Sequence, residues 1–114
     1  MARRDLSGAV DFSVLERTTG GDDDVSGEVL ALFVEQAAIW APLLEPGTDG
    51  WRDATHTLRG AAAGIGAGDL ARACAGAEAG DGAGLDRVRT ELDRALADVA
   101  AWRHELMLRS LKGA

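Results

Sequence analysis

The sequence has few of the residues that build β-sheets and cross-linked folds. It contains one cysteine and no tyrosine, and aromatic residues make up 4% of its 114 residues. Runs of β-branched residues, alternating apolar and polar positions and Asn-Gly hairpin signals are missing. Alanine, the strongest helix former, is abundant instead. We therefore expect an all-α protein. Its single Cys74 has no partner for an internal disulfide, which is typical of the reducing cytoplasm.

Other absences exclude whole classes of function. No apolar stretch approaches the roughly 20 residues that span a membrane, and no secretory apolar core follows residues 1–5. Acidic residues outnumber basic ones, 19 to 12, and the net charge of −7 disfavours nucleic-acid binding. There is no Walker-type phosphate loop and no pattern of metal ligands. We expect a cytoplasmic protein that binds no nucleic acid, no membrane and no cofactor of its own.

Apolar residues recur every three or four positions in four long segments, which predicts four amphipathic helices in a single domain over residues 1–114. A loose lead-in over residues 1–10 and one short extra helix precede them. The short helix lies between residues 11 and 20, and the long ones over about 25–44, 49–66, 69–79 and 85–111. Short loops between long helices predict an antiparallel up-down bundle.

Polar residues mark the expected helix starts. Asp11 is predicted to cap the short helix, and the acidic run 22–24 lies where the N-terminus of the next helix favours negative charge. Thr48 or Asp49 is predicted to cap the third long segment's helix after Pro46-Gly47, and Asp69 the one that follows.

The last helix is expected to be longer than its neighbours, about 40 Å at 1.5 Å per residue, so its end projects from the bundle. Trp102, Leu106 and Leu111 continue its apolar stripe into that end. This segment either packs back against the short first helix or pairs with a second copy of the chain. We expect packing within a monomer.

The helix over residues 49–66 carries a histidine on its outer face. At about 100° per residue, His56 lies away from the stripe through Leu58 and Ile65. The same face also carries Arg52, Asp53, Arg59, Gly60 and Ala63. Gly60 is notable because glycine costs about 1 kcal/mol relative to alanine inside a helix. The face therefore presents an imidazole between two guanidinium groups, beside a nearly bare helix surface.

These features suit a histidine that carries a phosphoryl group. Imidazole is a competent nucleophile near pH 7. A guanidinium one turn away can neutralise and hydrogen-bond the phosphoramidate that forms. Bare surface beside the histidine allows a partner's active site to approach within about 3 Å, the in-line distance for transfer.

The run from His56 to Ala62 reads His-Thr-Leu-Arg-Gly-Ala-Ala, and Gly66-Ala67 and Leu70 follow it. It resembles the signature of the histidine phosphotransfer (HPt) domain family of two-component phosphorelays, which reads His-x-Leu-Lys-Gly-Ser/Ala-Ala with a later Gly-Ala. The likeness spans nearly the whole chain, from Val10-Asp11 to Cys74 and Glu78. Arg59 stands where the family usually has Lys, which keeps the charge but replaces a point charge with a planar fork.

The resemblance implies a four-helix phosphotransfer bundle in which His56 is the phosphoacceptor, Arg59 steadies the phosphate and Gly60 gives clearance. Its partners would be receiver domains of response regulators and a hybrid or sensor histidine kinase, and Mg²⁺ would lie in the receiver's own site. The chain would carry phosphate between aspartates without making it from ATP. Asp53 and Ala63 are expected at the partner contact, together with Arg52, which we interpret as a solvated charge.

Two other functions stay open from the residues alone. A bundle that is not phosphorylated could bind a kinase or regulator through the same surface and block or scaffold it. A histidine-kinase dimerisation domain ranks last, because its histidine is normally followed by an acidic residue and a nearby proline, whereas Thr57 follows His56. His104 is interpreted as a solvated surface residue and Cys74 as a small buried side chain.

Overall fold

The structure is a computed structural model that describes residues 8–113. Its elements in chain order are α1 (Phe12–Thr19), α2 (Asp23–Trp40), the short 3₁₀ helix η2 (Ala41–Leu43), α3 (Trp51–Ile65), α4 (Gly68–Ala79) and α5 (Leu85–Gly113). Every element of this described part is helical, which confirms the all-α prediction. Within the same residues, no helix is both long and apolar enough to span a bilayer.

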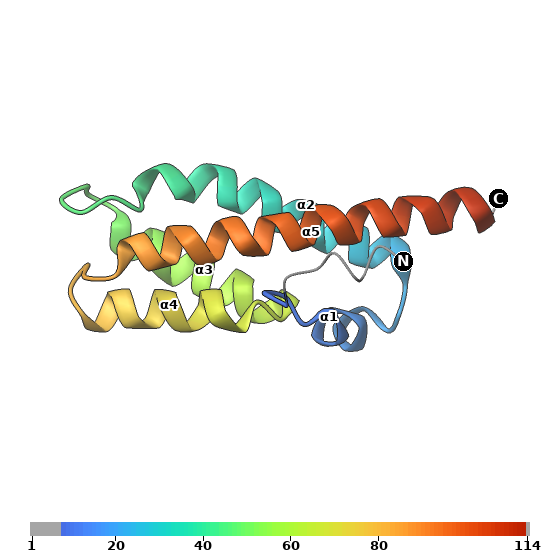
Figure 1. The fold of residues 1–114 in the computed structure, drawn as a ribbon, viewed down its shortest axis with the longest axis horizontal. Helices are drawn as coiled ribbons and strands as arrows, with labels where there is room; N and C mark the ends of the chain where they lie inside the picture. The colour runs from blue at the N-terminus through green and yellow to red at the C-terminus, as the bar shows by residue number, and fades with distance from the viewer. Residues whose placement is uncertain (1–7, 114) are drawn as a thin grey trace.

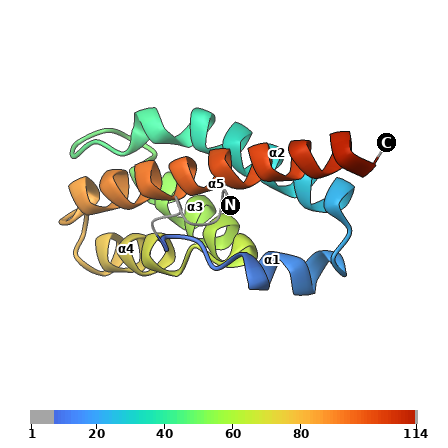
Figure 2. The same ribbon diagram turned by 45° about the vertical axis from the view of Figure 1, so that its right-hand side comes forward.

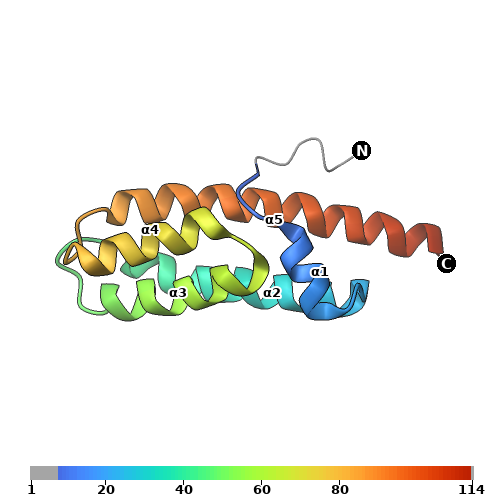
Figure 3. The same cartoon turned by 90° about the horizontal axis from the view of Figure 1, so that it is seen from below.

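Helices α2, α3, α4 and α5 lie side by side and alternate in direction, as Figure 1 and Figure 3 show. This is the predicted antiparallel four-helix bundle. The short α1 lies at one end, where the first half of α2 and the second half of α5 extend past α3 and α4 (Figure 2). The molecule is consequently elongated, with extents of 50 × 22 × 22 Å.

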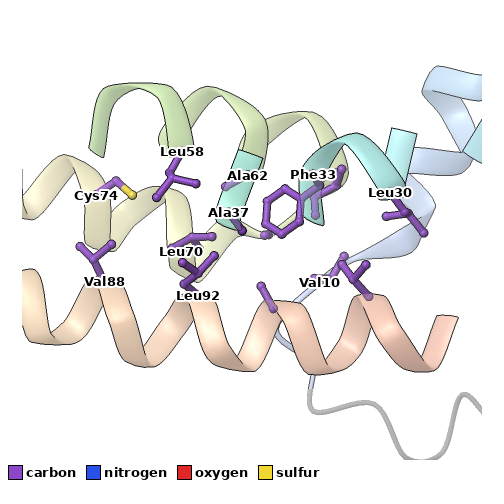
Figure 4. Close-up of a cluster of buried hydrophobic side chains, with 14 of the residues drawn as sticks. Val10, Leu30, Phe33, Ala37, Leu58, Ala62, Leu70, Cys74, Val88 and Leu92 are labelled. Carbon is purple, nitrogen blue, oxygen red and sulfur yellow. The ribbon is translucent and has the colours of Figure 1, made fainter. Parts of the chain in front are cut away.

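The core runs along the bundle axis and fixes the rotation of each helix. Figure 4 shows part of it, with Leu58 and Ala62 of α3 above Leu70 and Cys74 of α4 and Leu92 of α5. All of these side chains are buried, and a fully buried leucine contributes roughly 1.5–3 kcal/mol relative to an exposed one. Because α3 is held by its buried side, its opposite side faces the solvent.

The predicted cap at Asp11 is confirmed, and the acidic run 22–24 lies at the start of α2, as expected. The Asp11 carboxylate accepts hydrogen bonds from the Ser13 hydroxyl and the Ser13 amide, and these bonds lower the pKa of Asp11. Gly20 ends α1 in the left-handed conformation. Asp22 caps α2 by accepting from two amides of its first turn, and Asp23 and Asp24 follow in that turn.

The other predicted caps are wrong. Neither Thr48 nor Asp49 caps α3, because its N-cap is Gly50, which has a φ of 95° and lacks a capping side chain. Asp69 lies within the first turn of α4, whose N-cap is Ala67. Its charge still lies at the positive end of the helix, and the carboxylate forms an ion pair with Arg72.

The second helix also ends earlier than predicted. Instead of reaching Leu44, α2 stops at Trp40 and the chain continues as η2. Pro42 lies inside η2. It has no N–H to donate to an α-helical hydrogen bond, so the helix tightens into a 3₁₀ turn at this point. At its other end α2 begins at Asp23, two residues before the predicted start.

The prediction of a loose lead-in over residues 1–10 falls partly on residues 1–7, which lie outside the described residues. For the last part of that segment it is wrong. Ala9 and Val10 are buried against the bundle. The Val10 amide donates a hydrogen bond to Asp98 of α5, at 3.3 Å. The described chain is therefore attached to α5 before α1 begins.

The C-terminal half of α5 packs within the chain, as predicted. The Trp102 ring stacks on Phe12 of α1, with 4.7 Å between the ring centroids. Arg109 forms an ion pair with Asp23 of α2, at 3.4 Å. Beyond these contacts, Leu111 is 69% exposed. The monomeric state itself stays a prediction.

Candidate functional site

His56 lies near the middle of α3, on the side that faces the solvent. Its side chain is exposed, whereas Leu58 and Ala62 of the same helix are fully buried. The predicted exposure of His56 is therefore confirmed. Because the helix is anchored by its core side, the imidazole is presented from a rigid backbone to an approaching molecule.

Arg59 lies one turn after His56 and pairs with an acidic residue of the next helix. Its Nη1 atom is 3.4 Å from Oε2 of Glu78 on α4. The packing of α3 against α4 brings Glu78 beside the guanidinium, an acidic neighbour that the sequence of α3 alone does not indicate. Arg59 is therefore held at one edge of the exposed face of α3.

Arg52 lies one turn before His56 and is attached to the loop between α4 and α5. Its guanidinium forms an ion pair with Asp81 and stacks over the Trp51 ring, 4.5 Å from the ring centroid. Arg52 remains exposed, as expected of a solvated charge, and it is in addition paired with Asp81. Asp53 is also exposed, in the first turn of α3.

Gly60 and Ala63 are exposed and leave a bare strip on α3. A Cβ added at Gly60 would project into open space, with no atom of a neighbouring element within 4 Å. The same holds at Gly64, one turn further on. Packing therefore does not explain why glycine stands here in place of a better helix former. The predicted bare surface is present and extends to Gly64.

An apolar groove adjoins this strip, and we did not predict it. The groove has a volume of about 280 Å³ and is lined by Thr18, Val29, Leu32, Phe33, Gln36, Ala61, Gly64 and Ile65. Leu32 is 59% exposed, and Ile39 nearby on α2 is 60% exposed. An apolar groove with exposed apolar side chains on one of its helices is typical of a site for another macromolecule. A signal was present in the sequence: Val25, Leu32 and Ile39 form a second apolar row at seven-residue spacing.

The other candidate side chains lie apart from this face or inside the bundle. His104 is exposed on α5. Cys74 is fully buried, as predicted. Burial, and then the negative charge of Glu78, raises the pKa of Cys74 to about 11, so it is a neutral thiol at pH 7. Over residues 8–113, His, Cys, Asp and Glu side chains form no group of three or more that could hold a metal ion.

Comparison with protein-family models gives no match, and comparison with curated proteins gives none either. A solved structure does match the chain: the crystal structure of histidine phosphotransferase ShpA from Caulobacter crescentus, at 1.52 Å resolution. The two are 57% identical, and the match covers 91% of this chain and 99% of that one, with a TM-score of 0.85. The likeness thus extends to the sequence as well as the fold. The chain therefore belongs to the histidine phosphotransfer family and functions in histidine phosphotransfer within a phosphorelay.

Proposed function

We propose that His56 is the phosphoacceptor, which takes a phosphoryl group from a receiver-domain aspartate and passes it to another response regulator. One observation carries this assignment: His56 is exposed on a rigid helix, one turn from a held guanidinium and beside a strip that carries nothing larger than a methyl group. His104, the other histidine of the chain, is exposed on α5, where the exposed side chains of Met107 and Leu108 stand one turn further on.

For phosphoryl transfer, this chain has to supply a well-placed nucleophile, His56, and a positive charge close to it. The lone pair of an unprotonated ring nitrogen forms the P–N bond while the P–O bond to the partner's carboxylate breaks, and that carboxylate keeps the bonding electrons. The proton on the other ring nitrogen stays in place during the transfer. The reverse steps deliver the phosphoryl group to the next aspartate.

Arg59 serves as the cation that neutralises the phosphoryl group on His56, because both side chains leave α3 one turn apart. In this proposal Mg²⁺ comes with the receiver domain, and phosphate arrives from a hybrid or sensor kinase, so this chain carries phosphate and does not make it from ATP. These partners act in the cytoplasm, which is where we place the chain.

The receiver docks over His56 and the bare strip at Gly60, Ala63 and Gly64. Arg52 and Asp53 then lie at the rim of the contact on one side of the histidine. The apolar groove adjoining the strip, with Leu32 at its edge, is available to an apolar side chain of the partner. A polar rim around an apolar contact is the usual composition of a transient protein interface.

A phosphotransfer assay tests the assignment. The chain is incubated with a phosphorylated receiver domain, and acid-labile, base-stable label is measured on it. We expect wild-type protein and His104→Gln to take up label equally, and His56→Gln to take up none. Both histidines are exposed, so either substitution should change the free energy of unfolding by no more than about 0.5 kcal/mol.

Two results would contradict the assignment. If folded His56→Gln is labelled like the wild type, another residue accepts the phosphoryl group. If the wild type binds the receiver and takes up no label, the chain acts instead as an adaptor or inhibitor of a kinase or response regulator.

A further inference from the structure

Glu78 is an acidic residue beside the proposed phosphate-binding cation Arg59, and the phosphotransfer steps described above do not use it. It lies on α4, and its Oε2 atom is 3.4 Å from Nη1 of Arg59 on α3. The Glu78 side chain is 23% exposed and that of Arg59 is 41% exposed. Water therefore screens this pair less than it screens a pair on an open surface.

The Glu78 carboxylate depends on Arg59 for its neutralisation. Its second oxygen, Oε1, is buried and accepts no hydrogen bond from the residues that the structure describes. On the core side, one turn earlier on α4, lies the buried Cys74, whose pKa is raised first by burial and then by the nearby negative charge of Glu78. A carboxylate in such surroundings becomes costly when its cation is removed.

We propose that Glu78 is a positioning residue, which holds Arg59 in place before phosphorylation and competes with the phosphoryl group on His56 for its guanidinium. This inference rests on the proposed function of His56 and Arg59. Arg59 has five N–H donors in a rigid planar fork, so turning them toward a phosphoryl group weakens their contact with Glu78.

This competition affects where the phosphoryl group resides. When Arg59 turns to phosphate, the half-buried Glu78 loses part of its compensation, which raises the free energy of the phosphorylated chain. The carboxylate of Glu78 therefore favours onward transfer to a receiver over retention on His56. In the unphosphorylated chain, the same contact keeps the guanidinium close to the histidine.

The test measures the equilibrium constant that partitions phosphate between this chain and one receiver domain. Wild type, Glu78→Gln, Arg59→Ala and the double variant are compared, each shown to be folded by its melting transition. We expect Glu78→Gln to shift the partition toward phospho-His56 by about two- to tenfold. In the Arg59→Ala background, Glu78→Gln should change the logarithm of the partition constant by less than half as much as it does in the wild type. The reason is that the guanidinium for which Glu78 and the phosphoryl group compete is absent.

A matched control separates this effect from a general change of charge. Asp69→Asn also removes one negative charge from α4, from a carboxylate paired with Arg72, and should leave the partition unchanged. The inference is overturned if Glu78→Gln leaves the partition unchanged or shifts it toward the receiver. It is also overturned if the shift is the same with and without Arg59, which would indicate simple repulsion between Glu78 and phosphate.

The labelling of His56 distinguishes this result from a failure of the proposed function. If His56 is labelled and Glu78→Gln gives the same phosphate partition as the wild type, only the proposed role of Glu78 is wrong. If folded His56→Gln is labelled like the wild type, the assignment of the site fails and the role of Glu78 fails with it.

Discussion

His56 can serve as a phosphoacceptor only if the active site of a partner reaches it, and at the residue scale the small residues around it decide that access. Gly60 and Gly64 leave open space above α3, and Ala63 adds only a methyl group. A folded helix gains nothing from glycine at these positions. Access is therefore the physical reason that we assign to Gly60.

Replacing Gly60 with Gln tests this reason. The new side chain would occupy the approach to His56, and we expect phosphotransfer to slow by roughly ten- to hundredfold, since small misplacements of reacting groups have effects of this size. The free energy of unfolding should stay the same or rise by up to about 1 kcal/mol, because Gln is a better helix former. Rates come from transfer time courses and stability from urea unfolding.

Gly76→Gln is the matched control for that experiment. Gly76 is also helical and exposed, on α4, and a Cβ there meets open space. This variant should transfer phosphate at the wild-type rate. Equal rates for the Gly60 and Gly76 variants would mean that the surface at Gly60 is not the docking site.

The buried thiol of Cys74 gives a prediction about pH. Its pKa is raised from 9.0 to about 11 in the folded chain, so the unfolded thiol ionises first as pH rises. Below about pH 9 the thiol is protonated in both states, so its titration does not change the free energy of unfolding. Between about pH 9 and 11 the free energy of unfolding decreases, because the thiol ionises in the unfolded chain first. Urea unfolding at pH 8 and pH 10.5 should show a smaller loss of stability for Cys74→Ala than for the wild type. An equal loss in both proteins would contradict the burial of the thiol.

Sequence patterns predicted much of the exposed face of α3 around His56, but not its contacts with α4. The exposure of His56 and the bare surface at Gly60 follow from helical periodicity within one segment. Glu78 lies 19 residues after Arg59 on another helix, and only the packing of α3 against α4 brings the two charges together. Likewise, Leu32 and Gly64 meet in one groove only because α2 packs beside α3.

At the scale of elements, α1 and α3 approach each other closely at Gly66. Among the described glycines, this is the one where an added Cβ would come nearest to a backbone atom of another segment. Gly66 ends α3 with a φ of 87°, and a Cβ at this position would lie 2.2 Å from the carbonyl oxygen of Asp11. The Asp11 amide also donates a hydrogen bond to the Gly66 carbonyl, at 2.9 Å. The residue before α1 is therefore hydrogen-bonded to, and packed closely against, the end of α3.

Substitution of Gly66 with Ala should consequently destabilise the protein by about 2 kcal/mol or more, from the left-handed conformation and the overlap with Asp11. Gly64→Ala, two residues earlier in the regular helix and in open space, should raise stability by about 0.5–1 kcal/mol. Urea unfolding of the two variants measures this difference. A Gly66→Ala protein as stable as the wild type would show that α1 does not approach α3 this closely.

The helix ends show where local patterns are sufficient and where they are not. One turn of sequence is enough to predict the cap at Asp11 and the acidic start of α2 at residues 22–24, and both are confirmed. Asp69 has the same local signal, yet α4 begins one residue before it, at Gly68. The Gly66-Ala67 turn is hydrogen-bonded to Asp11, and we infer that this contact determines where α4 begins. A tertiary contact of this kind cannot be predicted from the local sequence.

At the scale of the whole molecule, α5 extends along α1 and α2 beyond the end of α3 (Figure 1). Trp102 and Leu106 are buried by this packing, whereas Leu108 and Leu111 remain exposed at 38% and 69%. The large buried side chains of the extension thus already have partners inside the chain, which favours a monomer.

Sedimentation equilibrium should accordingly give the mass of one chain, 11.8 kDa, across the micromolar range. A variant with Leu108→Gln and Leu111→Gln should sediment identically, because both side chains lie in the solvent of a monomer. A wild-type dimer that the double substitution converts to a monomer would show that the exposed end of α5 is an interface between copies.

Locating the phosphoryl group on the chain tests directly whether His56 is the phosphoacceptor. The wild-type chain, phosphorylated by a receiver domain, is kept at neutral to alkaline pH, digested and mapped by fragmentation mass spectrometry. We expect one phosphorylated residue, His56, in the peptide that also contains Arg59 or ends at it. Phosphate on His104 or on a carboxylate, with His56 unmodified, would contradict the assignment of His56 as the phosphoacceptor.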